Sequence, residues 1–371
     1  MSKGVFRPLL PFAAENNVRI LLPNARDIGK STPYTEAELK AIQSKDKTLE
    51  HAFMRDAVAE LGSFFAWFVT HNVIPPFKEN ASGKKTGGIS LIGWSAAGDW
   101  FIPFFAMADA IPERTRATIE PYMRSLLTYG KNAVLTRASL AHVMTIFPLD
   151  SPYYVIGHPD PPPQVYSPLR DPALSEEQRT VDFPAWVSGY YSNHSPKIRA
   201  ALKATSLDQL PTIEEFYNGV QNNHDTVGEG LAPTLLRIPK ETVAAMSETD
   251  SFMRSTLPVL YFHRELYAEW ARKLIFDADY AKKYFPRVYV RVIANMKGNV
   301  DCLLCSFLLK KMILERKAQG IDGRKMDVVL FEDVNHMVSI FLCSLRPPCS
   351  IFRQAHWDAP EETVKFFASV A

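Results

Sequence analysis

Residues 89–98 read ISLIGWSAAG, and this stretch decides the fold that the sequence predicts. Its first four residues are typical of a short buried strand, and an apolar stretch with helical character follows the turn. A sharp turn between a strand and a helix lifts its central residue out of the sheet, and small neighbours let such a turn close. Gly93 and Gly98 flank Ser95, and Ala97 stands where a glycine is usual. We therefore expect Ser95 at such a turn, with an ordinary glycine-rich turn as the alternative.

Apolar runs and helical patterns alternate on both sides of this stretch. The further expected strands are residues 18–23, 125–129, 288–293 and 328–331, and two long helices are expected at residues 49–73 and 303–318. This alternation predicts an α/β fold, in which helices cover both faces of a mostly parallel sheet. Residues 159–276 contain helical pieces and polar loops without a strand pattern. We expect them to form a helical lid inserted into a core of residues 1–158 and 277–371.

The composition excludes several classes of protein. With 371 residues, of which 47% are hydrophobic, the chain can bury a large core. A net charge of +2 gives no reason to expect a nucleic-acid partner. No apolar run is long enough to span a bilayer, and the N-terminus has no cleavable signal pattern. Four cysteines in a chain of this length do not indicate a disulfide scaffold, so we expect a cytoplasmic protein.

Three residues with complementary chemistry each follow an expected strand. They are Ser95, Asp301 and His336. Because the carboxyl ends of parallel strands meet at one edge of a sheet, we expect these side chains to lie together. A serine hydroxyl needs a base to become a nucleophile, and the base needs a group that orients it. We assign the base to His336, the orienting acid to Asp301, and one oxyanion-hole donor to the backbone N–H of Ala96.

Each assignment has an alternative in the sequence. Asp301 could instead cap the helix that begins near Cys302, because aspartate is a favoured N-cap. Asp150 is the rival for the acid, and His356 is the fallback for the base. Cys302 and Cys305 have no second pair at ligand spacing, so we assign them to packing. We expect no metal and no cofactor.

Three short motifs carry a resemblance to a known family. They are the turn around Ser95, residues 24–31 (NARDIGKS), and the pair Asn335 and His336. Together they resemble the α/β-hydrolase superfamily, and within it the fungal-type serine hydrolases of the fold-1 group. The resemblance covers most of residues 5–160 and 285–371. It implies an α/β-hydrolase fold, in which a serine, an acid and a histidine follow each other in this order along the chain.

The chain departs from the family pattern in three places. The family has strands before the position of Val18, and a His-Gly loop there supplies the second oxyanion donor, so we expect these first strands to be missing. Residues 130–149 and 338–355 have the character of insertions. We explain these departures by an imperfect gene model, with a late start and one or two translated introns. The spliced transcript tests this hypothesis.

The function expected from the sequence is that of a serine hydrolase. Ser95 would cleave an ester or related acyl bond of a small, mainly apolar substrate through an acyl-enzyme, and the oligomeric state is left open. A serine nucleophile argues against haloalkane dehalogenase and soluble epoxide hydrolase chemistry. Lid residues that could line the pocket, or form the lid's own core, are Phe183, Trp186, Tyr190 and Tyr191. The alternative is a catalytically weak or inactive binding protein with this fold.

Overall fold

The structure is a computed structural model of the whole chain. It describes residues 6, 9–79, 81, 85–91, 93–126, 148–149, 151–225, 232–246, 248–332, 335–337, 361 and 364. Two sequence alternatives, Asp150 and His356, lie outside the described residues. The expected insertions also lie outside them, except for the last two residues of 130–149.

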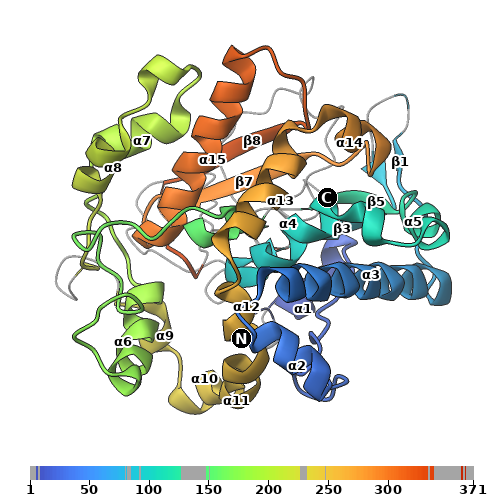
Figure 1. Cartoon of the computed structure of the whole chain (residues 1–371), viewed down its shortest axis with the longest axis horizontal. Coiled ribbons are helices and arrows are strands. Elements are labelled where there is room, and N and C mark those ends of the chain that lie inside the picture. Colours follow the sequence, from blue (N-terminus) through green and yellow to red (C-terminus); the bar gives the residue numbers. More distant parts are fainter. Residues whose placement is uncertain are drawn as a thin grey trace.

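Helices dominate this part of the chain. Their bounds are α1 (Leu10–Ala13), α2 (Glu36–Gln43), α3 (Lys47–His71), α4 (Gly98–Ala106), α5 (Glu113–Ile119), α6 (Glu176–Ser188), α7 (Pro196–Lys203), α8 (Ile213–Gly219), α9 (Thr234–Arg237), α10 (Lys240–Met246), α11 (Thr249–Ser251), α12 (Leu257–Leu260), α13 (Arg264–Phe276), α14 (Ala278–Lys283) and α15 (Val300–Ala318). Figure 1 shows α3 running along one side of the molecule and α15 lying against β7 and β8. None of the described helices has the length and apolar character needed to cross a bilayer.

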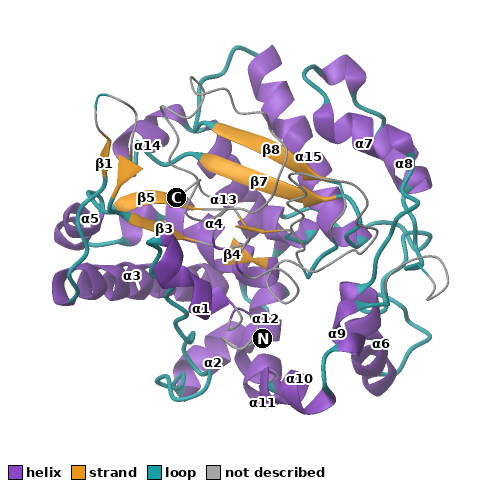
Figure 2. Ribbon diagram, turned by 180° about the vertical axis from the view of Figure 1, so that it is seen from behind, coloured by secondary structure: helices purple, strands orange, loops and turns teal. Residues whose placement is uncertain are grey.

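The strands are short and fall into three separate groups. Their bounds are β1 (Lys78–Glu79), β2 (Lys85–Thr86), β3 (Ile89–Leu91), β4 (Gly93–Trp94), β5 (Met123–Leu126), β6 (Pro148–Leu149), β7 (Val290–Asn295) and β8 (Met326–Phe331). Strands β1 and β2 are antiparallel, β3 and β5 form a parallel pair, and β4, β6, β7 and β8 pair in parallel in this order. Among the described strands, only β7 and β8 pair along six residues each. Figure 2 shows these two strands side by side.

The expected fold is therefore wrong. The described strands make up only 7% of the chain, and the mostly parallel sheet of an α/β-hydrolase, covered by helices on both faces, is not seen in the described residues. Residues 18–23, expected as a strand, form neither helix nor strand. The stretch 89–94 is divided, because β3 pairs with β5 whereas β4 pairs with β6. An apolar run indicates burial, but it does not say which strand will pair with it, and a sheet grows only where partners match in register.

One large hydrophobic cluster holds most of the described elements together. Its largest fully buried members are Tyr153, Phe104, Phe105, Phe216, Phe262, Tyr267, Trp270, Phe285 and Phe307. Helix α13 packs on α4 and shares this cluster with α15, although α13 falls within the expected lid. Helices α6 and α9 lie together at another corner, away from α3 and α5 (Figure 1). The division into core and lid stays a prediction.

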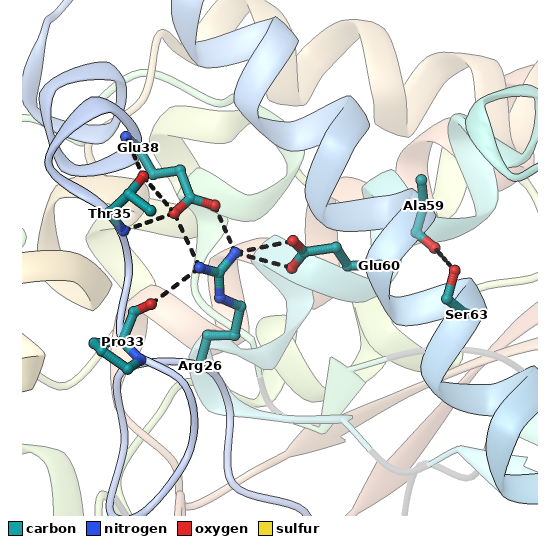
Figure 3. A network of polar contacts seen from close by, with 7 residues as sticks. All are labelled: Arg26, Pro33, Thr35, Glu38, Ala59, Glu60 and Ser63. Atoms are coloured by element: carbon teal, nitrogen blue, oxygen red, sulfur yellow. Dashed lines mark hydrogen bonds and ion pairs between the residues drawn. The ribbon is translucent and has the colours of Figure 1, made fainter.

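The loop that carries the motif NARDIGKS is anchored by its charged residues. Arg26 Nη2 donates to Glu38 Oε2 at 2.9 Å and to the carbonyl of Pro33 at 3.0 Å. Arg26 Nη1 also donates to Glu60 at 2.9 Å, so one guanidinium joins the loop to α2 and α3 (Figure 3). The buried carboxylate of Asp27 accepts from Arg254 at 3.0 Å, and this ties the loop to the segment before α12.

Glu38→Gln tests this ion-pair network. The hydrogen bond from Arg26 is the main reason that the pKa of Glu38 is lowered from 4.5 to about 2. A lowered folded-state pKa contributes stability above the unfolded value, and this stability is lost as the pH falls through the folded value. We expect Glu38→Gln to cost about 1 kcal/mol at pH 6. The gap in Tm between the variant and the wild type should shrink between pH 4.5 and pH 2.

The matched control is Glu36→Gln, on the exposed first turn of the same helix. It removes the same charge without touching Arg26, so we expect a much smaller gap at every pH. A gap for Glu38→Gln that stays constant from pH 6 to pH 2 would show that the charge of Glu38 does not stabilise the fold.

Candidate functional site

Ser95 lies in a strained turn between β4 and α4. The turn is the 3₁₀ segment Ser95–Ala97, and the φ angle of Ser95 is +56°. A side chain other than glycine in this region costs about 1–3 kcal/mol and persists only where the surroundings hold it. The hydroxyl of Ser151 donates to the carbonyl of Ser95 at 2.7 Å and is one such constraint. Ser95 itself is half-buried.

His336 lies directly against this hydroxyl. Its Nε2 is 3.0 Å from Ser95 Oγ, although 241 positions separate the two residues in the chain. The ring of Trp94 stacks on the imidazole, with centroids 5.6 Å apart and planes at 27°. Trp94 Nε1 also donates to the backbone carbonyl of His336 at 3.0 Å. The structure thus brings two of the three expected residues within hydrogen-bond distance and holds the imidazole, which is 2% exposed, in place.

The structure directs Asp301 to a different partner. Both oxygens of its buried carboxylate accept from Arg170 Nη1 at 2.8 Å. Burial raises the pKa of Asp301, and the charge and hydrogen bonds of Arg170 oppose that rise. Arg170 also donates to the Tyr153 hydroxyl at 3.3 Å and to the Val165 carbonyl at 3.0 Å. The carboxylate of Asp301 thus pairs with the half-buried guanidinium of Arg170 and not with His336.

The capping alternative for Asp301 is also not what the structure has. Asn299 is the N-cap of α15, and its side chain accepts from the backbone N–H of Cys302 at 3.3 Å. Asp301 lies in the first turn of the helix instead. Asparagine and aspartate are about equally favoured as caps, so composition alone did not separate the two.

Cys302 occupies the position expected for the acid. Its Sγ is 3.4 Å from Nδ1 of His336, on the side of the ring away from Ser95. The cysteine is 2% exposed. From the sequence we assigned Cys302 to packing. The sequence feature that could have pointed to a place in the site is that Cys302 follows Asp301 at the start of a helix.

Asn335 holds the segment that carries His336. Its Nδ2 donates to the carbonyl of Ser188 at 2.7 Å and to the hydroxyl of Thr234 at 3.1 Å. Its own carbonyl accepts from Nδ2 of Asn295, the last residue of β7, at 3.0 Å. Asn335 is fully buried and so connects the ends of β7, α6 and α9. The sequence marked Asn335 only as a neighbour of His336.

An apolar cluster lies beside Ser95 and His336. Its buried members are Trp186, Val187, Tyr191, Leu235, Ile238 and Met337, and the half-buried Phe6, Trp94, Tyr166, Phe183 and Val243 pack against them. Trp94 and Met337 are the chain neighbours of Ser95 and His336. Three of the four expected lining residues are therefore in this cluster, and the fourth, Tyr190, is buried at 3% exposure.

Ala96 follows Ser95 in the same turn, just before the nine-residue helix α4. A backbone N–H at this place can face an oxyanion, and the N-terminus of the helix adds a positive dipole. The role of Ala96 stays a prediction. Residues Pro148–Leu149, the end of one expected insertion, form β6 and link β4 to β7.

Comparisons with known proteins leave the family open. The chain matches no protein-family model, and neither the curated proteins nor the solved structures yielded a similar protein. The resemblance drawn from the motifs therefore stays an expectation, and the functional argument depends on the geometry around Ser95.

Arg170→Met tests the environment of Asp301. Removing one partner of a buried ion pair leaves an uncompensated charge and costs about 3–5 kcal/mol. We expect this loss in urea denaturation at pH 7. It should become smaller as the pH falls, because protonation of Asp301 removes the buried charge. The double variant Arg170→Met/Asp301→Leu should regain most of the loss.

Arg199→Met is the control, because its ion pair with Glu332 lies at the surface. It should cost less than about 1 kcal/mol. A double variant no more stable than Arg170→Met would show that the unpaired carboxylate is not the source of the loss.

Proposed function

We propose that this chain is a serine hydrolase that cleaves an ester or related acyl bond through an acyl-enzyme on Ser95. The observation that carries the proposal is the 3.0 Å contact between Ser95 Oγ and His336 Nε2. The left-handed backbone of Ser95 adds support, because strained residues gather at active sites. A serine in an ordinary turn has neither a base at this distance nor a reason for such a φ angle.

The reaction follows from the two atoms in contact. His336 Nε2 takes the hydroxyl proton while Ser95 Oγ attacks the carbonyl carbon of the substrate. The same proton then passes to the leaving alcohol, and the acyl group stays on Ser95. Water, deprotonated by His336, releases the acid and restores the serine. The N–H of Ala96 is the donor we propose for the oxyanion.

The substrate class follows from the neighbouring residues. The cluster that contains Trp186 and Tyr191 reaches Trp94 and Met337, so apolar side chains flank both reacting residues. Such surroundings favour a small, mainly apolar acyl or alkyl group and disfavour a charged one, because burial of an unpaired charge is costly.

A fluorophosphonate probe tests the proposal directly. The probe phosphonylates a serine that has an activating base, so we expect labelling of the wild type. Ser95→Ala should abolish labelling, and His336→Ala should slow it at least about 1,000-fold. Ser63→Ala, on the exposed face of α3, is the control and should label at the wild-type rate. Intact-mass and peptide mass spectrometry measure both the extent and the site.

A second function is binding without turnover. The observation that favours it is the engagement of Asp301 by Arg170, which leaves no carboxylate of that residue to orient His336. Folded wild-type protein that is never labelled, but that binds an apolar ester in calorimetry, would replace the hydrolase proposal by this one.

A further inference from the structure

We infer that His194 is an acid-sensitive latch, which holds the segment after α6 against the loop between β7 and α15 while its imidazole is neutral. The latch joins three stretches that are far apart in the chain, residues 189–195, 219–225 and 296–299. The inference concerns the conformation of the protein and does not depend on catalysis by Ser95.

Both nitrogens of the His194 ring contact the backbone of other stretches. Nε2 lies 3.1 Å from the carbonyl oxygen of Gly298, and Nδ1 accepts from the backbone N–H of Gln221 at 3.0 Å. A ring nitrogen that accepts carries no proton, so the ring is neutral and donates its Nε2–H to Gly298. An imidazolium carries a proton on both nitrogens. Protonation would therefore set an N–H of the ring against the N–H of Gln221 and break this contact.

The stretches around the ring are closely packed. The N–H of Ser195 donates to the carbonyl of Gly219 at 2.8 Å. A Cβ atom at Gly219 would lie 2.5 Å from Oγ of Ser195, so only glycine allows this approach. The ring of Tyr191 stacks on that of His194, with centroids 6.0 Å apart, and His194 is 8% exposed. An imidazolium at this place would lose most of its hydration, which is costly.

The titratable residues around His194 come from all three stretches. They are Tyr191 in its own stretch, His224 and Asp225 in the second, and Lys297 in the loop. Burial raises the pKa of Tyr191 well above the usual value, so this phenol stays neutral. His224 Nδ1 lies 3.0 Å from the backbone carbonyl of Asp225, and the carbonyl of Lys297 accepts from the N–H of Tyr191 at 3.1 Å. Because backbone groups occupy both nitrogens of His194, the carboxylate of Asp225 acts on this ring through its charge.

Burial outweighs the attraction of that carboxylate. It lowers the pKa of His194 from 6.5 to about 4, although the carbonyl of Gly298 and the charge of Asp225 raise it. When the latch opens, the ring enters water and its pKa returns to about 6.5. The open form therefore binds more protons between pH 6.5 and pH 4. The stability of the latch is fully present above this range and is lost as the pH falls through it.

Release of the latch should loosen the surroundings of Ser95. Gly298 directly precedes Asn299, the N-cap of α15. Tyr191 is bonded to the same loop and belongs to the apolar cluster that contains Met337. Opening in acid would therefore take support from the start of α15 and from this cluster at the same time.

Hydrogen–deuterium exchange of the full chain, followed by mass spectrometry, tests the inference in the wild type. Peptides from residues 189–195 and 219–225 contain the amides that the latch protects, including the N–H of Gln221. After correction for the intrinsic exchange rate at each pH, their opening should increase about 20-fold between pH 7 and pH 5. Residues 56–66 of α3, which contain no histidine, should change less than about 2-fold.

His194→Gln tests whether this imidazole is the source of the response. The glutamine amide can still donate to Gly298 but does not titrate, so opening should change less than about 2-fold between pH 7 and pH 5. His224→Gln removes a half-buried histidine of the neighbouring stretch and is the matched control. It should keep the rise of about 20-fold. His194→Asn, whose amide oxygen can accept from Gln221, is a second variant without a titrating group.

Equal opening of the wild type at pH 7 and pH 5 overturns the inference, and so does a wild-type response in a folded His194→Gln or His194→Asn protein. If neither variant folds, the wild-type peptides decide alone. A rise confined to residues 189–195 and 219–225 supports the latch, whereas an equal rise in residues 56–66 indicates general unfolding in acid and rejects it. None of these readouts needs turnover, so failure of the latch and failure of the hydrolase proposal are distinguished.

Discussion

The hydrogen bond between Ser95 and His336 joins the two ends of the four-stranded parallel group. Ser95 follows β4 and His336 comes after β8, with β6 and β7 between them. Neighbouring strands lie about 4.8 Å apart, so the segment after β8 must cross roughly 14 Å to reach the serine. Asn335 makes this path possible. Its backbone carbonyl is held by Asn295, and its buried side chain is bonded to Ser188 and Thr234. The site therefore depends on the docking of α6 and α9 as much as on the strands.

The sequence predicted local features better than distant ones. The turn at Ser95 follows from small residues between a strand and a helix, and the structure places a left-handed serine there. The sheet could not be predicted, because pairing depends on the register between segments far apart, and residues 89–94 divide between two groups. The pairing of Asp301 with Arg170 spans 131 positions and leaves no local pattern. Charged pairs of this kind are decided by the tertiary structure alone.

The orientation of α15 about its own axis decides which of its side chains contacts Nδ1 of His336. Successive residues of an α-helix point about 100° apart, so Asp301 and Cys302 cannot face the same group. The cap at Asn299 fixes where the helix begins and thereby which residue points to the ring. With Cys302 against the imidazole, Asp301 is turned toward Arg170, and the two bonds of 2.8 Å hold it there.

This arrangement makes the contacts of Asp301 and Cys302 depend on each other. A rotation of α15 that brought the carboxylate to His336 would take from Arg170 its partner and leave a half-buried guanidinium unpaired, which is unfavourable. It would also move Cys302 into the apolar packing of the helix, where a neutral thiol is easily accommodated. The ion pair thus opposes such a rotation. The 3.4 Å contact between Cys302 Sγ and His336 Nδ1, and the pairing of Asp301 with Arg170, both follow from where α15 begins.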